Sequence, residues 1–503
     1  MTTTTTTLPA GEVDTEPLIL SRVRLGARGP LCSVQIESGR ITAVSTTEPP
    51  HRPGTRTVDL DGRTVLPGLW DAHVHATQWA STRRRLDLSG LATARAVAAA
   101  AQDGARSLPP GEILVGYGFR DGLWPDRPHK DLLDALLPGQ PVVLVSADLH
   151  TAWISSAALS LLGRGDHPTG VLRERDALEA TEALPAVPVA VTDRWVREAC
   201  EAAAARGVTG FLDFEFADNA TDWTRRTSEA PTPVRIAAAV YPDYLETAIE
   251  RGLRTGQLLP ESRGLVEVGP LKLFTDGSLN TRTALCHEPY PGLEGADARG
   301  IAAISPEELV RLMRRAAAHG IEPAVHAIGD RANGIALDAF EEVRCRGRIE
   351  HAQLINHRDL PRYAALGITV GVQPAHATDD RDVADRHWPG RTGRAFAYAD
   401  LLASGARLEL GSDAPVSPLD PWVGIASAVS RTDDDRPAWH PEQELPLHAA
   451  LTAAARGRRL IRVGDTADLV IVDTDPLTAD APTLREMPVH ATMLAGRWTY
   501  RSG

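Results

Sequence analysis

The stretch Leu66-Pro67-Gly68-Leu69-Trp70-Asp71-Ala72-His73-Val74-His75 leads from an apolar segment directly into two histidines. Its composition predicts a buried strand over 68–75 that ends on this pair. Residues i and i+2 of a strand point to the same side, so two imidazoles placed this way can hold one metal ion. A His-x-His pair alone is a weak signal. Its position after an apolar strand, however, matches the rim of a parallel barrel, where active sites lie.

Further apolar segments alternate with helical patterns downstream of this stretch, which favours a parallel sheet or barrel. The predicted strands span 68–75, 208–214, 234–241, 270–275, 322–327, 348–353, 368–373 and 408–413. Helical patterns cover 193–206, 306–319 and 332–344. Eight strands are what a (β/α)8 barrel requires. We therefore predict an α/β fold, with a TIM-like (β/α)8 barrel over 68–459.

The remaining segments predict additions to the barrel. Short strand patterns occur in 17–67 and again in 460–503, so the two chain ends are expected to form one small composite β-sandwich domain. The stretch 80–190 is too long for one crossover and is expected to be an insertion that folds over the barrel mouth. Residues 1–16 contain six consecutive threonines after Met1 and predict a disordered tail.

Composition excludes several classes of partner. The chain of 503 residues is 43% hydrophobic and 24% charged, as in ordinary globular proteins. Its net charge of −13 argues against nucleic acid or an anionic membrane as the main partner. No apolar run approaches the ~18 residues that span a bilayer. We expect a small-molecule substrate, and homo-oligomer formation is left open.

The four cysteines, Cys32, Cys200, Cys286 and Cys345, lie far apart and show no Cys-x-x-Cys spacing. They indicate neither a cysteine zinc site nor a disulfide framework. The start of the chain also lacks the basic and apolar regions of a signal peptide. Together these features predict a reducing, cytoplasmic location.

Lysine usage singles out one residue. Of 53 basic residues only two are lysines, Lys130 in a polar stretch and Lys272 within the apolar segment 268–274. A buried charge is costly unless something uses it, and arginine cannot give up its proton. A neutral lysine can act as a nucleophile or take up carbon dioxide to become an anionic carbamate. The alternative is a codon or solvent bias that spared this lysine by chance.

Other predicted strands also end on residues that bind metals. His326 ends one apolar run, His351 ends the next, and Asp413 places a carboxylate at the end of the last strand. Each could be a rim residue with ordinary hydrogen bonds. Five predicted strands, including those that carry His73 and Lys272, end on such residues, and chance is a poor explanation for all five. These residues therefore predict one catalytic site.

The order of these residues along the chain resembles that of the amidohydrolase superfamily. More narrowly, it resembles the amidohydrolase-3 branch, which includes N-substituted formamide deformylase-like enzymes. The resemblance runs from about residue 17 to 500 and is carried by the segments 66–75, 271–279 and 467–473. Two departures stand out. Ser155-Ser156 occurs where branch members have Asn-Ser, and Gly464-Asp465-Thr466-Ala467-Asp468 replaces a Gly-Lys-x-Ala-Asp pattern.

The resemblance implies a carbamylated Lys272, formed with carbon dioxide, that bridges two divalent metals, with zinc expected. It assigns His73, His75 and Asp413 to one metal, and His326 and His351 to the other. Metal-bound hydroxide would then attack a carbonyl carbon, and Asp413 would pass the proton to the leaving amine. The implied function is a metal-dependent amidohydrolase that cleaves a non-peptide C–N bond in an amide, N-formyl or N-acyl compound.

Three other functions stay open at this stage. They are an esterase or lactonase using the same site, a mononuclear deaminase, and an inactive binding protein. Candidate substrate contacts are His150, Asp276, Arg282 and Trp124. Each of these has a structural alternative, because large aromatics in particular are more often part of a core.

Overall fold

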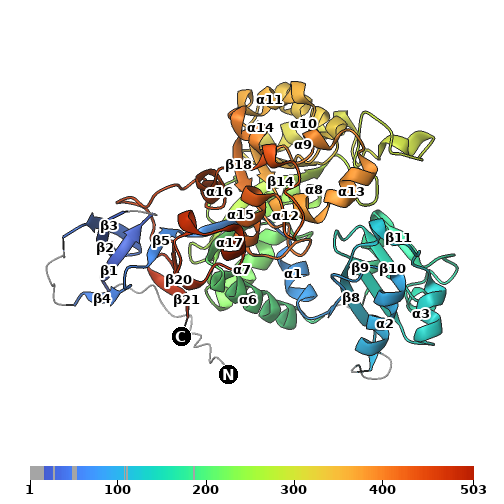
Figure 1. Cartoon of the computed structure of the whole chain (residues 1–503), viewed down its shortest axis with the longest axis horizontal. Coiled ribbons are helices and arrows are strands. Elements are labelled where there is room, and N and C mark those ends of the chain that lie inside the picture. Colours follow the sequence, from blue (N-terminus) through green and yellow to red (C-terminus); the bar gives the residue numbers. More distant parts are fainter. Residues whose placement is uncertain are drawn as a thin grey trace.

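The computed structural model describes residues 16–26, 29–47, 54–106, 108, 112–184 and 187–502. The tail predicted over 1–16 lies outside these residues apart from Glu16. The described chain forms three sheets, and Figure 1 shows the barrel between a sheet of the chain ends and a sheet built within 86–173.

The central sheet is the predicted barrel. Its eight strands pair in parallel in the order β18-β17-β16-β15-β14-β13-β12-β6. A bridge between Val74 and Ala414 joins the first strand to the last and closes the ring. Each predicted strand is found within a few residues of its expected place. The strands are β6 (Leu69–Val74), β12 (Val208–Asp213), β13 (Arg235–Val240), β14 (Val266–Phe274), β15 (Pro323–Ala327), β16 (Arg348–His351), β17 (Thr369–Val372) and β18 (Arg407–Leu410).

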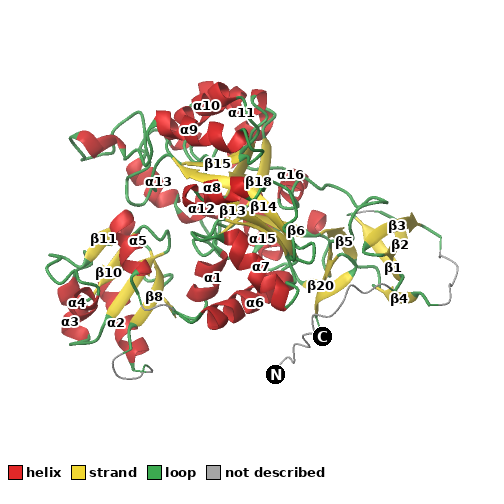
Figure 2. Cartoon of the chain, turned by 180° about the vertical axis from the view of Figure 1, so that it is seen from behind, coloured by secondary structure: helices red, strands yellow, loops and turns green. Residues whose placement is uncertain are grey.

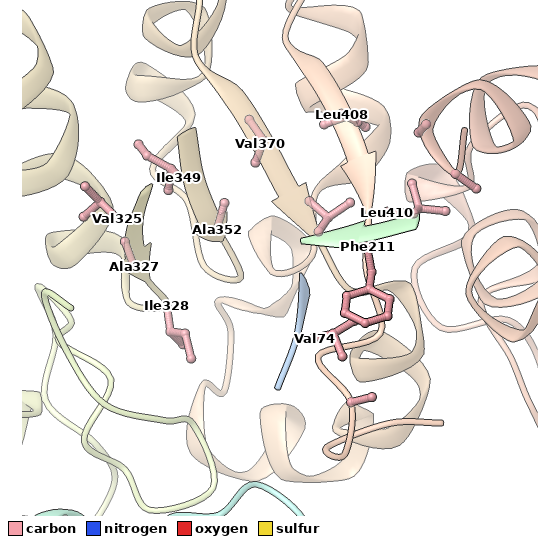
Figure 3. Packing of buried hydrophobic residues seen from close by; sticks show 14 of the residues in the cluster. Val74, Phe211, Val325, Ala327, Ile328, Ile349, Ala352, Val370, Leu408 and Leu410 are labelled. Atoms are coloured by element: carbon pink, nitrogen blue, oxygen red, sulfur yellow. The ribbon is translucent and has the colours of Figure 1, made fainter. Parts of the chain in front are cut away.

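Side-chain alternation explains how these strands both build a core and carry a site. Val325, Ile349, Val370 and Leu408 lie in register across β15 to β18 and belong to the main hydrophobic core (Figure 3). The next row begins with His326 and contains Glu350 and Glu409, so it places polar groups on the other side of the sheet. A period of two therefore separates packing outside the barrel from chemistry inside it.

Helices surround the barrel, and the predicted ones are confirmed in α6, α9 and α10 (Figure 2). The helices outside the inserted segment are α1 (Ala76–Thr82), α6 (Val189–Ala205), α7 (Asn219–Glu229), α8 (Pro242–Glu250), α9 (Pro306–Ala317), α10 (Asp330–Val343), α11 (Leu360–Ala365), α12 (Pro374–Asp379), α13 (Arg381–His387), α14 (Tyr398–Ala403), α15 (Pro421–Ser430), α16 (Leu447–Ala453) and α17 (Ala481–Arg485).

Strands from both chain ends form one mixed sheet of eight strands. It joins the two ends through the antiparallel pairing of β5 with β19. Its buried side chains, such as Leu20, Val34 and Ile471, form a separate hydrophobic cluster. The strands are β1 (Leu18–Leu25), β2 (Leu31–Glu37), β3 (Arg40–Ser45), β4 (Arg56–Asp59), β5 (Thr64–Pro67), β19 (Leu469–Val472), β20 (Val489–Leu494) and β21 (Arg497–Arg501).

The long segment between β6 and β12 contains a sheet of five strands in the order β11-β10-β9-β8-β7. It lies on the opposite side of the barrel from the sheet of the chain ends (Figures 1 and 2). Its elements are β7 (Leu86–Asp87), β8 (Leu114–Phe119), β9 (Val142–Ser146), β10 (Thr151–Ile154), β11 (Val171–Arg173), α2 (Ala94–Ala105), α3 (Lys130–Leu136), α4 (Ser156–Leu161) and α5 (Arg175–Glu182). Within the described ranges, no helix has the length and apolar character to cross a bilayer.

Candidate metal centre

A cavity of about 490 Å³ opens at the carboxyl ends of the barrel strands. All six predicted metal ligands line it, together with the substrate candidates His150 and Asp276. Residues of the inserted segment, among them Phe119 and Leu149, complete its wall. The parallel barrel thus brings together side chains that are up to about 340 residues apart in the sequence, at the end where such barrels carry their sites.

His73, on β6, is held in one orientation. Its Nδ1 donates a hydrogen bond to Glu350 Oε2 at 2.8 Å, because a carboxylate can only accept. Its Nε2 then faces Asp413 Oδ1 at 3.4 Å and the Lys272 nitrogen at 3.2 Å. Burial, with Lys272 adding to it, lowers the pKa of His73 to about 4. The imidazole is therefore neutral, and Nε2 offers a lone pair.

Asp413 follows β18 and brings a carboxylate to the same point. Its Oδ1 lies 3.4 Å from Nε2 of both His73 and His75. Burial by itself raises the pKa of Asp413, but the neighbouring histidines outweigh burial and hold it well below the usual value. The backbone of Asp413 has φ 58°, and that of His351 has φ 72°. Left-handed backbone at non-glycine residues is strained and is often found at functional sites.

The second pair of histidines lies beside the first. The rings of His326 and His351 are 4.4 Å apart, and that of His351 is 5.0 Å from the ring of His73. Nδ1 of His351 faces Gln373 Oε1 at 3.0 Å, which leaves Nε2 of His351 as the free nitrogen. Burial lowers the pKa of His326 and of His351 well below the ordinary value, so both rings are neutral.

Lys272, on β14, is 1% exposed and lies among these groups. Its nitrogen is 4.1 Å from the centre of the Phe214 ring. Among the described residues, no carboxylate oxygen lies within ion-pair distance of it. Burial lowers the pKa of Lys272 to about 8, despite the opposing charges of Glu350 and Asp413. The amine is therefore easier to deprotonate than an exposed lysine.

These donors fit a divalent metal. His73, His351 and Asp413 each offer one ligand atom, and these atoms lie within 4.8 Å of one another. Nδ1 of buried His75 has no hydrogen-bond partner in the described structure. Imidazole nitrogens with a carboxylate oxygen are the ligands that zinc takes in hydrolytic sites. The tightest cluster combines members of both predicted ligand sets, His73 and Asp413 from one and His351 from the other.

The predicted substrate contacts divide into two groups. His150 lines the cavity, and its Nδ1 lies 2.6 Å from Glu174 Oε2. Asp276 also lines it, but its carboxylate accepts backbone N–H groups of Leu285, Ile328 and Gly329. Burial raises the pKa of Asp276 to about 7, although these hydrogen bonds oppose the rise. Asp276 therefore ties together the loops after β14 and β15.

Trp124 and Arg282 are absent from the described lining of the cavity. Trp124 packs in the core of the inserted sheet, where its indole N–H donates to the Leu91 carbonyl at 3.2 Å. Arg282 lies half-buried in the loop after β14. Both residues lie near functional segments in the sequence, but neither lines the cavity.

Sequence reasoning missed several residues that orient the site. Glu350 precedes a predicted ligand and Gln373 ends a predicted strand, so the strand pattern marked their positions but not their roles. His376, on α12, is buried, and its Nε2 lies 4.0 Å from Asp413 Oδ2 without a hydrogen-bond partner. Nothing in the local sequence of His376 distinguished it from a structural histidine.

Known proteins are similar in sequence to this chain over most of its length. Residues 56–500 match the model of the amidohydrolase family. The protein YtcJ of Bacillus subtilis (strain 168) is 29% identical, over 89% of this chain and 91% of its own. The N-substituted formamide deformylase of Arthrobacter pascens is 27% identical, over 93% and 94% of the two chains.

Solved structures agree with this match. An uncharacterized metal-dependent hydrolase of Pyrococcus furiosus has a TM-score of 0.72 and 26% identity, over 92% of this chain and all of its own. A similar hydrolase of Pyrococcus horikoshii OT3 has a TM-score of 0.74 at 24% identity, over 93% and 99% of the two chains, which bears on the fold alone. Because the family model covers the whole barrel and the strands β4, β5, β19 and β20 of the sheet of the chain ends, this chain belongs to the amidohydrolase family.

Proposed function

We propose that this protein is a metal-dependent amidohydrolase that cleaves a non-peptide C–N bond of a small molecule, in an amide, N-formyl or N-acyl group. One observation carries the proposal: side chains at the carboxyl ends of five barrel strands converge on one cavity. A relative named for deformylation of N-substituted formamides, similar over 93% of this chain, supports the bond type.

The residues that would hold divalent metals, zinc in our proposal, are His73, His75 and Asp413 at one position and His326 and His351 at the other. Bound metal ions would supply positive charge that polarises the substrate carbonyl and makes a water molecule more acidic. The neutral state of His73, His326 and His351 supports this role, because a protonated imidazole has no lone pair to offer a metal.

Lys272 would join the two positions as a carbamate. Its neutral nitrogen would attack carbon dioxide: an N–C bond forms, the π electrons of one C=O bond move to its oxygen, and the nitrogen loses a proton to solvent. The product is an anion with two oxygens facing one way, which neither lysine nor arginine can provide. Burial, a pKa lowered to about 8, and the lack of an ion-pairing carboxylate among the described neighbours support this assignment.

Asp413 would move the proton during hydrolysis. Its pKa is held well below the ordinary value, so the carboxylate is ionised at neutral pH and can accept a proton from the attacking water. It would then deliver that proton to the leaving nitrogen, since an amide nitrogen leaves poorly as an anion. The position of Oδ1, 3.4 Å from Nε2 of both His73 and His75, supports this role.

A screen of the purified, zinc-loaded protein tests the proposal. The panel contains N-formyl and N-acyl amines, ureas, esters and lactones, and metal content is measured beside turnover. We expect metal-dependent release of amine from the N-formyl or N-acyl compounds. Turnover of esters or lactones alone would instead indicate an esterase, and ammonia release from aminopurines or aminopyrimidines a deaminase. An intact fold that takes up no metal would indicate a binding protein.

The location is proposed on the chemistry of the cysteines. Cys32, Cys200, Cys286 and Cys345 are all unpaired in the structure. Free thiols persist in a reducing compartment, which supports a cytoplasmic site of action.

A further inference from the structure

The outer part of the cavity has an apolar wall. Phe216 and Ile301 line it and are 39% and 43% exposed, unusually open for large apolar residues. Phe216 stacks on Phe274 with ring centres 5.8 Å apart and on the ring of His75 at 5.4 Å. The wall therefore begins directly beside the metal centre. Apolar surface left open in a cavity marks a place where an apolar group binds.

The cationic groups of this outer part already have carboxylate partners. Nη2 of Arg120 donates to Asp379 Oδ2 at 3.0 Å, and Nη1 to Asp380 Oδ1 at 3.3 Å. Asp148, a third carboxylate of the lining, also acts on the charge of Arg120. One guanidinium is thus paired with two carboxylates and lies in the field of a third, which leaves an excess of negative charge.

The two other cations of the outer lining are paired as well. His150 is bonded to Glu174 at 2.6 Å. Arg175 pairs with Glu179 at 2.8 Å, and its side chain is 89% exposed. Away from the metal centre, the described lining therefore offers no cation without a carboxylate partner to meet an anionic substrate.

We infer that this cavity selects amides that are uncharged and carry an apolar substituent, and that it excludes amides with a carboxylate on that substituent. The inference rests on the proposed function and narrows its substrate class. A substrate carboxylate against the outer wall would lose its hydration, meet Asp148 and Asp379, and find no free partner. Like charges brought together in this way cost binding and turnover.

Three compounds of nearly equal shape isolate the effect of charge. They are N-(2-phenylethyl)formamide, N-formylphenylalaninamide and N-formylphenylalanine, assayed with the zinc-loaded full-length protein at pH 8. We expect kcat/KM values within about tenfold for the two neutral compounds, and a value at least roughly 100-fold lower for the acid. Turnover of the acid within tenfold of the matched amide would overturn the inference.

A charge change in the wall gives a second test. In Asp379→Asn, Nη2 of Arg120 loses its ionic partner while Nη1 stays paired with Asp380, so the wall has one negative charge fewer. The ratio of kcat/KM for the amide over the acid should fall by roughly tenfold, as expected when one carboxylate that repels the acid is removed. The matched control is Asp338→Asn on α10, an exposed carboxylate paired with Arg362, which should leave the ratio as in the wild type. An unchanged ratio in Asp379→Asn, with zinc content retained, would count against the inference.

Calorimetric titration separates failure of this inference from failure of the proposed function. If neither these compounds nor the N-acyl amines of the wider panel are hydrolysed, the proposed function fails, and binding of N-formylphenylalaninamide and N-formylphenylalanine to the zinc-loaded protein still tests the selection. Weaker binding of the acid supports the inference. Equal or tighter binding of the acid overturns it.

Discussion

At the scale of single residues, Glu350 decides how His73 can act. Its Oε2 accepts the Nδ1 proton of His73, and Arg348 holds the other oxygen. Burial raises the pKa of Glu350, but Arg348 and His73 outweigh burial and lower it to about 2. The carboxylate is therefore always ionised and fixes the imidazole with Nε2 toward the centre. Carboxylates that orient a metal-binding histidine in this way tune metal affinity.

Glu350→Gln should lower zinc affinity by roughly 10–100-fold, because an amide holds the Nδ1 proton less strongly than a carboxylate. Competition with a chromophoric chelator measures the dissociation constant. The control is Glu409→Gln, since Glu409 pairs with Arg348 at 2.8 Å but is not bonded to His73. Equal losses of affinity in both variants would mean that Glu350 acts through Arg348 and not through the histidine.

Lys272→Arg keeps the charge but cannot form a carbamate, so kcat/KM should fall at least roughly 100-fold, with loss of bound zinc. Labelling with ¹³C-bicarbonate should give a carbamate carbon signal in the wild-type protein that is missing from the variant. The other lysine of the chain provides a matched control. Lys130 donates to the His167 carbonyl on the inserted segment, and Lys130→Arg should retain activity, zinc and signal. Wild-type turnover in Lys272→Arg would rule out the carbamate.

The predicted ligands could be found from sequence because each ends an apolar strand, a pattern that local composition reveals. The groups that orient them could not. Glu350 and Gln373 reach their partners across neighbouring strands, and Glu174 meets His150 only through the pairing of β10 with β11. Their roles depend on register and on side-chain direction, which no single segment encodes. Trp124 and Arg282 show the converse, because closeness in sequence did not place them at the cavity.

At the scale of elements, the seam between β6 and β18 closes the barrel. Gly411, just after β18, lies so close to β6 that a Cβ added there would be 2.7 Å from the His73 backbone nitrogen. The Asp413 N–H donates to the His73 carbonyl at 2.8 Å across the same seam. A side chain at Gly411 would therefore push apart the two strand ends that carry His73 and Asp413.

Gly411→Ala should lower the free energy of unfolding by about 1–3 kcal/mol, the cost typical of overpacking a tight contact. Urea denaturation measures the change. Gly424, on α15, has no atom within 4 Å of an added Cβ, so Gly424→Ala is the matched control. It should be neutral or stabilise by about 0.5–1 kcal/mol, because alanine favours the helix. Equal stability of Gly411→Ala and the wild type would show that the seam tolerates a side chain.

Hydrogen bonds of Glu174 join the inserted segment to the barrel. Glu174 bonds to His150 within the insertion, and its Oε1 accepts from the Thr283 hydroxyl of the loop after β14 at 2.7 Å. Burial lowers the pKa of His150, but Glu174 outweighs burial and raises it to about 9. Burial raises the pKa of Glu174, but His150 outweighs it and lowers the value to about 2. Both groups are charged at neutral pH.

The pair predicts a pH dependence of stability. The raised pKa of His150 gives a contribution that is complete below its usual value of 6.5 and is lost as the pH rises through about 9. The lowered pKa of Glu174 gives one that is complete above 4.5 and is lost as the pH falls through about 2. Glu174→Gln should therefore lower the free energy of unfolding most between pH 4.5 and 6.5, by about 1–3 kcal/mol.

Unfolding by urea at pH 5.5, 7.5 and 10 measures the difference in free energy of unfolding between Glu174→Gln and the wild type. This difference should be smaller at pH 10. The control is Glu442→Gln, which removes an exposed partner of His440 and should have no measurable effect at any of these pH values. A difference for Glu174→Gln that stays constant from pH 5.5 to 10 would contradict the assigned ionisation of His150.

At the scale of the whole molecule, the barrel was the most predictable part. Its strands are buried on both faces, so they appear in the sequence as apolar runs. The helices with long amphipathic patterns could also be predicted from the sequence. The internal sheet of the inserted segment was not predicted, because its strands are only 2–6 residues long and their pairing mixes parallel and antiparallel neighbours. The position of this sheet beside the barrel depends on contacts such as Arg120 with Asp379, which are made far apart in sequence.

The barrel, the inserted segment and the sheet of the chain ends contribute differently to the cavity. The barrel provides the candidate metal ligands, the inserted segment provides His150, Arg120 and part of the cavity wall, and the sheet of the chain ends packs on the other side. The candidate metal ligands and part of the cavity wall thus come from different segments of the chain.

The most direct test of the central claim is a zinc titration of the metal-depleted protein, in the presence of bicarbonate, with formate release from N-(2-phenylethyl)formamide as the readout. We expect negligible turnover without metal and a rise with added zinc that levels off at two ions per chain. Turnover by the metal-depleted protein equal to that of the zinc-loaded protein would contradict the claim that His73, His75, Lys272, His326, His351 and Asp413 form a hydrolytic metal centre.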